Sequence, residues 1–254
     1  MNMLAVLALL VLWWPAVSQA PPQELDFAPV GVRYAADANP ARRAIDYDTI
    51  GRARFNVVAA PADAAGQTTA LTRVDRPALG APPASVAVRT SDLGIVPITA
   101  TTTAETVKET AWTLFARGSR GVIFDDWLAL QQNAAALAEA SAFAQTITSN
   151  MALYAPLRHV EQTGARAVAM KGGEGSVETH WLESAEALLL IAVNRGADAR
   201  QVVWTFPPEV PEAVWQNMLS GGSVNFVAGP TGPFYEHAMP AHGVLVLMIR
   251  KRWK

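Results

Sequence analysis

Residues 121–127 read Gly-Val-Ile-Phe-Asp-Asp-Trp, a short apolar run that ends in two acids and an indole. An apolar run of this length, following a predicted helix and ending in polar residues, is typical of a buried strand. Ligands of parallel α/β sheets collect outside the carboxyl ends of the strands. We therefore expect Asp125 and Asp126 to lie at a ligand-binding edge, with Trp127 beside them.

The N-terminal part of the chain carries a strand–helix–strand pattern. Residues 30–34 form an apolar run, residues 41–53 have helical character after Asn39 and Pro40, and residues 55–59 form a second apolar run. This spacing predicts a βαβ unit and hence a parallel sheet. Residues 61–83 are rich in Ala, Gly, Thr and Pro without a period, which predicts a long loop.

Two more short strands and two helices complete the predicted α/β domain. The strands fall at 85–88 and 94–98. The first helix has capping-box spacing at Thr102 and Glu105 and a stop at Gly118, and the second covers about 131–149. The pattern predicts a reduced, open layer of four or five mostly parallel strands. Its exposed edges need a cover, supplied by the 61–83 loop, the C-terminal domain or a second copy of the chain.

The period changes from helical to strand-like near residue 177. Short apolar runs separated by Gly, Pro, Asn and Asp predict an antiparallel β-sandwich; they lie at 177–183, 187–194, 201–206, 213–217, 224–227 and 243–249. We place the domain boundary at 160–176. The expected organisation is a signal peptide over 1–20, an α/β domain over 21–160 and a sandwich over 177–254.

Composition narrows the classes of function. The chain has 254 residues, is 51% hydrophobic and 17% charged, carries a net charge of −2 and contains no cysteine. The charge gives no general attraction to nucleic acid or to anionic membranes. The absence of cysteine excludes disulfides, thiolate metal sites and cysteine nucleophiles.

The first twenty residues predict export. Residues 3–17 are apolar and uncharged but shorter than the ~20 residues of a spanning helix. The small residues Ala16, Ser18 and Ala20 are typical of a signal-peptide cleavage site. Cleavage there would release a secreted or periplasmic chain. An uncleaved N-terminal anchor is the alternative, and beyond this segment we expect no membrane contact.

The two aspartates cannot act as a facing pair, because adjacent strand residues point to opposite faces. At most one is expected in a cleft as a catalytic or binding carboxylate, with the other at the following turn. The alternative is that both are loop acids that solvate the end of the strand. Arg33, Tyr34 and Asp37 follow the first strand and are candidate substrate-binding residues. Trp127 is a candidate for stacking on a sugar ring, with a place in the core as its alternative.

No cofactor or metal site is expected. The sequence has no P-loop, no Gly-x-Gly-x-x-Gly fingerprint and no Gly-x-Ser-x-Gly elbow. Its four histidines lack the i, i+4 helical spacing of a metal site. Trp181, Trp204 and Trp215 lie in the predicted sandwich, as core residues or as a sugar-stacking strip.

Several stretches resemble bacterial beta-galactosidase-like glycoside hydrolases of clan A. Residues 31–34 and 55–58 resemble the first two strands of their (β/α)8 barrel, and residues 116–127 resemble the last. Residues 189–195, 215–222 and 243–247 are similar to their small C-terminal β-domain. The resemblance implies a reduced barrel and a carbohydrate ligand. It does not supply the catalytic pair, because the chain has no Asn-Glu dipeptide and about 120 residues where a full barrel takes ~250.

Three functions follow as hypotheses. The first is an exported, glycoside-hydrolase-like protein that binds carbohydrate without the retaining catalytic pair. The second is an active glycosidase that uses Asp125 or Asp126 with a second acid about 5–9 Å away; Asp37 is placed for this role, whereas Glu105 is expected in the helix cap. The third is a non-catalytic structural module of the cell envelope.

Overall fold

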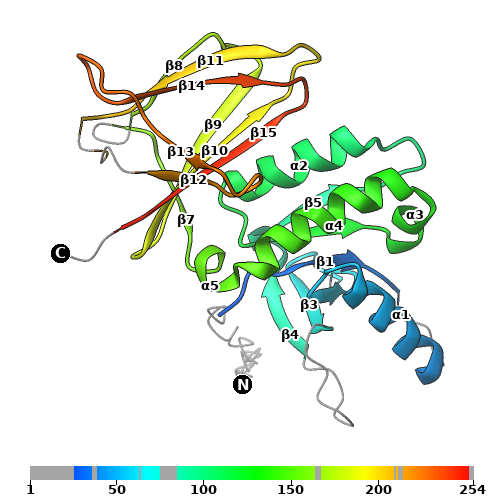
Figure 1. The fold of residues 1–254 in the computed structure, drawn as a ribbon. Helices are drawn as coiled ribbons and strands as arrows, with labels where there is room; N and C mark the ends of the chain where they lie inside the picture. The colour runs from blue at the N-terminus through cyan, green and yellow to red at the C-terminus, as the bar shows by residue number, and fades with distance from the viewer. Residues whose placement is uncertain are drawn as a thin grey trace, which may run out of the picture.

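The computed structural model describes residues 26–35, 39–62, 64–74, 85–163, 167–208, 210 and 214–251 (Figure 1). The predicted signal segment and Asp37 lie outside these residues. In chain order the elements are β1 (Val30–Arg33), α1 (Pro40–Arg52), β2 (Val57–Ala59), β3 (Thr68–Arg73), β4 (Ser85–Arg89), the 3-10 turn η1 (Thr90–Asp92), β5 (Leu93–Pro97), α2 (Ala104–Ala116), β6 (Gly121–Asp125), α3 (Trp127–Gln132), α4 (Ala134–Ser149), α5 (Met151–Tyr154), β7 (Arg158–Val160), β8 (Ala169–Lys171), β9 (Val177–Glu183), β10 (Ala187–Asn194), β11 (Arg200–Thr205), β12 (Trp215–Asn217), β13 (Ser223–Val224), β14 (Phe234–Met239) and β15 (Val244–Arg250).

The N-terminal sheet is mixed and curled. Its strand order is β4-β3-β2-β1-β6-β5, with β2, β1, β6 and β5 parallel and β3 antiparallel to both neighbours. The two edge strands, β4 and β5, are joined only by the three residues of η1. A flat sheet of this order would hold its edges far apart, because neighbouring strands are spaced about 4.8 Å. The sheet must therefore bend round on itself, and it forms a partial barrel.

Side chains alternate between the two faces of this sheet, as strand geometry requires. The concave inner face holds one apolar cluster drawn from both edges and the middle: Phe27, Val57, Ala59, Leu71, Val88, Leu93 and Ile123. The outer face of β1 and β6 packs instead against α2 and α4 through Val30, Val32, Val122 and Phe124. Figure 1 shows both helices on that side of the sheet.

The helices begin where capping side chains satisfy their free backbone N–H groups. Asn39 caps α1, with Pro40 in the first turn, as the sequence predicts. Helix α2 starts one residue later than expected: Thr103, not Thr102, accepts from the backbone N–H of Thr106. The hydroxyl of Thr102 instead accepts from the backbone N–H of Thr99, so it belongs to the preceding turn.

The C-terminal part is a sandwich of antiparallel sheets. One sheet has the order β13-β12-β15-β10-β9-β7 and the other β14-β11-β8. Their facing sides share an apolar core that includes Trp181, Trp204 and Trp215, each fully buried. The three tryptophans are therefore core residues rather than an exposed stacking strip.

Strand β10 joins the two parts of the molecule. All eight of its residues are buried. Leu190 and Ala192 face the sandwich core, while Leu189, Ile191 and Val193 share a cluster with residues of α2 and α4. The near-continuous apolar sequence of this strand reflects burial on both faces.

Two sequence expectations need correction. Residues 61–83 are not a structureless loop, because β3 lies within them and pairs with β2. It supplies the cover that the parallel edge needs. The sandwich also contains β7, β8 and β14, which the apolar pattern did not predict. β7 and β8 have only three residues each, and polar residues interrupt the apolar ones in β14, so none of the three carries a clear strand pattern of its own.

Candidate functional site

The two neighbouring aspartates have different positions. Asp125 lies at the end of β6 on the same face as Ile123, so it points to the inner side of the curled sheet. There its Oδ2 accepts a hydrogen bond from Nη1 of Arg33 at 2.9 Å. Arg33 ends β1, the strand next to β6, and the two residues come one step beyond the Val32–Phe124 pair. We call this ion pair, at the carboxyl ends of the strands, the mouth.

Asp126 serves the backbone of the following helix. Its φ is 78°, a left-handed conformation that a non-glycine residue seldom adopts. Its Oδ1 accepts from the backbone N–H of Ala129 at 3.1 Å, so it is the N-cap of α3. Asp126 thus holds the following turn, as expected for one of the two aspartates, and Asp125 lies on the inner face of the sheet. A role for Asp125 in a site stays a prediction.

The mouth retains hydrogen-bonding capacity. The side chain of Arg33 is 26% exposed and that of Asp125 is 37% exposed. Within the described residues, Nε of Arg33 is buried without a hydrogen-bond partner. A guanidinium has five N–H donors and a carboxylate has about four acceptor sites, so this single contact uses a small part of each.

Tyr34 is next to the mouth but is directed to α1. Its hydroxyl donates a hydrogen bond to Oδ2 of Asp46. Its ring packs against the outer apolar cluster, and its backbone N–H bonds to the carbonyl of Ala59 at 3.3 Å. The predicted substrate-binding role of Tyr34 thus competes with a structural one that ties β1 to α1.

Trp127 cannot stack on a ligand in this conformation. It is 2% exposed, and Phe55 packs against it edge-on with ring centroids 6.1 Å apart. The alternative role that the sequence analysis gave for Trp127, a place in the core, is the one observed. The expected sugar-stacking role fails for a physical reason. Helix α3 begins directly after Asp126, so Trp127 is its first residue and its indole is buried.

The end of β5 lies at the same edge and was missed by sequence reasoning. Pro97 is in register with Asp125, so the chain leaves β5 beside the mouth. Exposed threonines follow, and the hydroxyl of Thr99 lies 3.2 Å from that of Thr101 and 3.0 Å from that of Thr102. Their signal in the sequence is the run of threonines between a strand and a helix.

A second charged cluster joins α2 to the sandwich, and we call it the seam. Glu178 on β9 accepts hydrogen bonds from Arg117 at 2.8 Å and from Arg195 at 2.9 Å. Nε2 of His180 lies 3.5 Å from the same carboxylate. Partial burial alone would raise the pKa of Glu178, but the bonds from Arg195 and Arg117 outweigh it and lower the pKa.

The seam also brings two histidines together, because the rings of His159 and His180 lie 5.7 Å apart. Burial lowers the pKa of His180 despite the nearby Glu178 carboxylate. That carboxylate is already occupied by two guanidinium groups. Among the described residues, no group of three or more His, Cys, Asp or Glu side chains is placed to hold a metal ion. None of the helices in the described part of the chain is long and apolar enough to cross a bilayer.

Comparison with known proteins gives only distant similarity. No protein family and no curated protein matches the sequence. Among solved structures, a catalytic mutant of a GH42 beta-galactosidase from G. stearothermophilus aligns at 15% identity with a TM-score of 0.24, over 34% of this chain and 10% of its own. A GH30 endoxylanase from Clostridium papyrosolvens aligns at 12% identity with a TM-score of 0.38, over 59% and 39%.

A maltogenic alpha-amylase from Thermotoga neapolitana gives a TM-score of 0.43 at 9% identity, over 63% of this chain and 41% of the amylase. The chain thus spans less than half the length of each of these enzymes. They are glycoside hydrolases by name, but similarity at this level carries no argument about activity. The case for function depends on the mouth.

Proposed function

We propose that this protein binds a neutral carbohydrate or a similar polyol at the mouth, through Arg33 and Asp125, and does not hydrolyse it. The observation that carries the proposal is the partly exposed Arg33–Asp125 pair at the carboxyl ends of two adjacent parallel strands. Ligands of α/β sheets bind at this edge. Both groups keep donors and acceptors that no described residue uses.

The geometry favours binding over hydrolysis. Glycosidic hydrolysis requires one carboxyl group that donates a proton and a second carboxylate about 5–9 Å away across the substrate. Asp125 accepts from Arg33, Asp126 caps α3, and Asp46 accepts from Tyr34. Each of these carboxylates therefore has an acceptor role. Export of the chain, which depends on residues 1–20, is part of the same proposal.

Binding is tested on residues 21–254 with a glycan array, followed by calorimetric titration of the best neutral oligosaccharide. Asp125→Asn and Arg33→Gln should each weaken binding about tenfold, because each removes a charge-assisted hydrogen-bonding group. Asp126→Asn is the matched control, since asparagine caps a helix as well as aspartate does. Unchanged affinity in both mouth variants would refute the proposal.

A chromogenic-glycoside screen tests the hydrolase alternative on the same proteins. Turnover by the parent chain that disappears in Asp125→Asn would favour an enzyme over a binding protein.

A further inference from the structure

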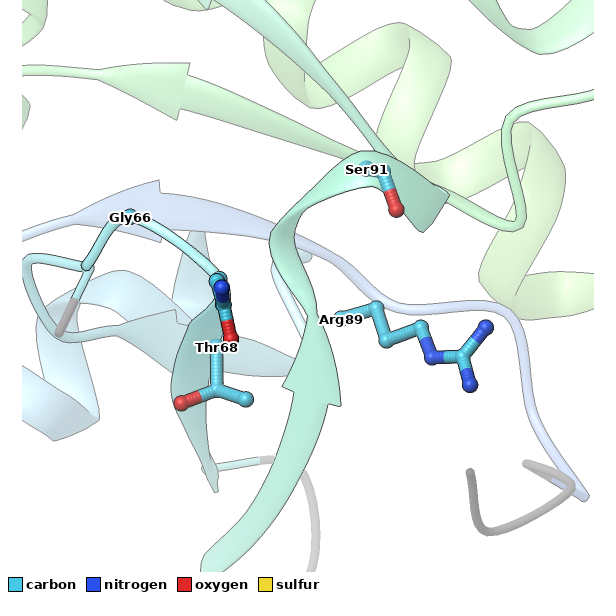
Figure 2. Close-up of a pocket in the computed structure, with 5 residues that line it drawn as sticks. Gly66, Thr68, Arg89 and Ser91 are labelled. Carbon is cyan, nitrogen blue, oxygen red and sulfur yellow. The ribbon is translucent and has the colours of Figure 1, made fainter. Parts of the chain in front are cut away.

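A pocket lies away from the mouth, where β3 begins and β4 ends. Its volume is about 430 Å³, and Gly66, Gln67, Thr68, Arg89 and Ser91 line it (Figure 2). On β4, Val88 belongs to the inner apolar cluster, so its neighbour Arg89 lies on the outer face of the curled sheet. This pocket and the mouth are therefore on opposite faces of the sheet.

The walls of the pocket are held together by the backbone. Thr68 and Arg89 are cross-strand partners, so their side chains leave the same face of the β3–β4 pair. The backbone N–H of Thr90 donates to the carbonyl of Gln67 at 2.9 Å, and the hydroxyls of Thr69 and Thr90 lie 3.1 Å apart. The pocket is thus formed before any ligand arrives, which lowers the entropic cost of binding.

The lining is polar and carries a single sign of charge. The five lining residues are a glycine, a glutamine, a threonine, an arginine and a serine, and none of them carries a carboxylate. In the described part of the chain, neither the guanidinium of Arg89 nor the hydroxyl of Ser91 has a hydrogen-bond or ion-pair partner. Figure 2 shows these two groups on the same side of the segment that leads from β4 into η1. Arg33 and Arg117, in contrast, are each paired with a carboxylate.

We infer that this pocket binds a small organic anion whose carboxylate, sulfate or phosphate group pairs with Arg89. The planar fork of a guanidinium matches the oxygens of these groups, and the Ser91 hydroxyl is a second donor. The volume falls within the range of small-molecule sites, about 300–1,000 Å³, and is larger than a bare inorganic anion fills. The volume also leaves room for the body of a small ligand, and a hexose that carries an acidic group is the probe chosen to test this.

The test measures binding of matched hexoses to the full chain by calorimetry and by amide chemical shifts. The probes are glucuronate, glucose 6-sulfate and glucose 6-phosphate, with glucose as the neutral analogue and inorganic phosphate as the bare anion. At least one acidic hexose should bind about tenfold more tightly than glucose and inorganic phosphate, with an affinity that falls as salt is added. The shifted amides should include those of residues 66–68 and 89–91.

Variants then assign the binding to the pocket. Arg89→Met keeps the apolar stem but removes the charge, and it should weaken binding of the acidic hexose about tenfold, while Ser91→Ala weakens it about threefold. Arg250→Gln, which removes an exposed cation of β15 in the sandwich, should have no effect. Thermal melts of each variant report whether it folds.

Four results would overturn the inference. The first three are equal binding of glucose and the acidic hexoses, unchanged affinity in a folded Arg89→Met variant, and no binding of any acidic hexose with a Kd below about 1 mM. Inorganic phosphate binding as tightly as glucose 6-phosphate would show a bare-anion site and would also contradict it. None of these outcomes depends on Arg33 or Asp125, so the result stands apart from the test of the mouth.

Discussion

The mouth and the seam use the same chemistry in different ways. In each, an aspartate or glutamate is bonded to arginine at the end of a secondary-structure element. At the seam, Glu178 receives two guanidinium groups and has His180 beside it, so its acceptor sites are largely taken. At the mouth, Asp125 receives one guanidinium, whose Nε has no partner in the described structure. The comparison teaches that spare hydrogen-bonding capacity, rather than the presence of an ion pair, distinguishes a candidate site from a structural joint.

The largest effect is expected from the apolar core beneath the seam. Ile191 lies on β10, fully buried, in the cluster that β10 shares with α2 and α4. Ile191→Ala should lower the free energy of unfolding by about 3 kcal/mol, because it removes buried methyl groups and leaves a cavity. Urea denaturation followed by tryptophan fluorescence measures this change. A single transition is expected, since the two parts share one core; two separate transitions would show that the seam does not couple them.

A smaller loss of stability is expected from the seam itself. Glu178→Gln leaves Arg117 and Arg195 without their shared carboxylate and should cost about 1 kcal/mol, in line with partly exposed ion pairs. The pKa of Glu178 is lowered in the folded protein, so its contribution is present above the unfolded value of 4.5 and is lost as the pH falls below it. Chemical denaturation at pH 7 and at pH 3.5 measures how far the free energy of unfolding changes between the two. This change should be smaller for Glu178→Gln than for the parent chain.

His180 should make stability depend on pH in a higher range. Burial lowers its pKa below the ordinary value of 6.5, so the unfolded chain binds a proton more readily than the folded one. Stability should therefore fall as the pH drops below 6.5. His180→Gln should flatten this part of the profile, measured as the melting temperature between pH 7.5 and 5.5. His237, whose pKa burial also lowers, contributes in the same direction and stays in both proteins.

The smallest effect on stability is expected at the mouth. Asp125→Asn should change the free energy of unfolding by about 0.5 kcal/mol, because the pair is partly exposed to solvent. The same substitution is expected to weaken carbohydrate binding about tenfold. Chemical denaturation beside calorimetric titration of one protein batch separates the two effects. A loss of stability larger than that of Glu178→Gln would reverse the comparison and make the mouth a structural joint.

Sequence reasoning placed the main helices and apolar strands well, because their periodicity reports burial directly. Asn39 and Pro40 mark the start of α1, and the all-apolar run of β10 marks a strand buried on both sides. It missed β3 and β14, whose residues are largely polar or small. Such strands are held by backbone pairing with neighbours that lie far away in the chain, which no local pattern reports.

The candidate sites divide in the same way. The sequence by itself determined that Asp125 and Asp126 face opposite ways and that a strand end carries them, because both follow from the two-residue repeat of a strand. Only the tertiary structure decided that Arg33 meets Asp125, that Trp127 is buried, and that Arg89 lines a pocket with no partner among the described residues. These outcomes depend on how the sheet curls and which strands become neighbours, and strand order is set by packing across the whole domain rather than by the residues of any one strand.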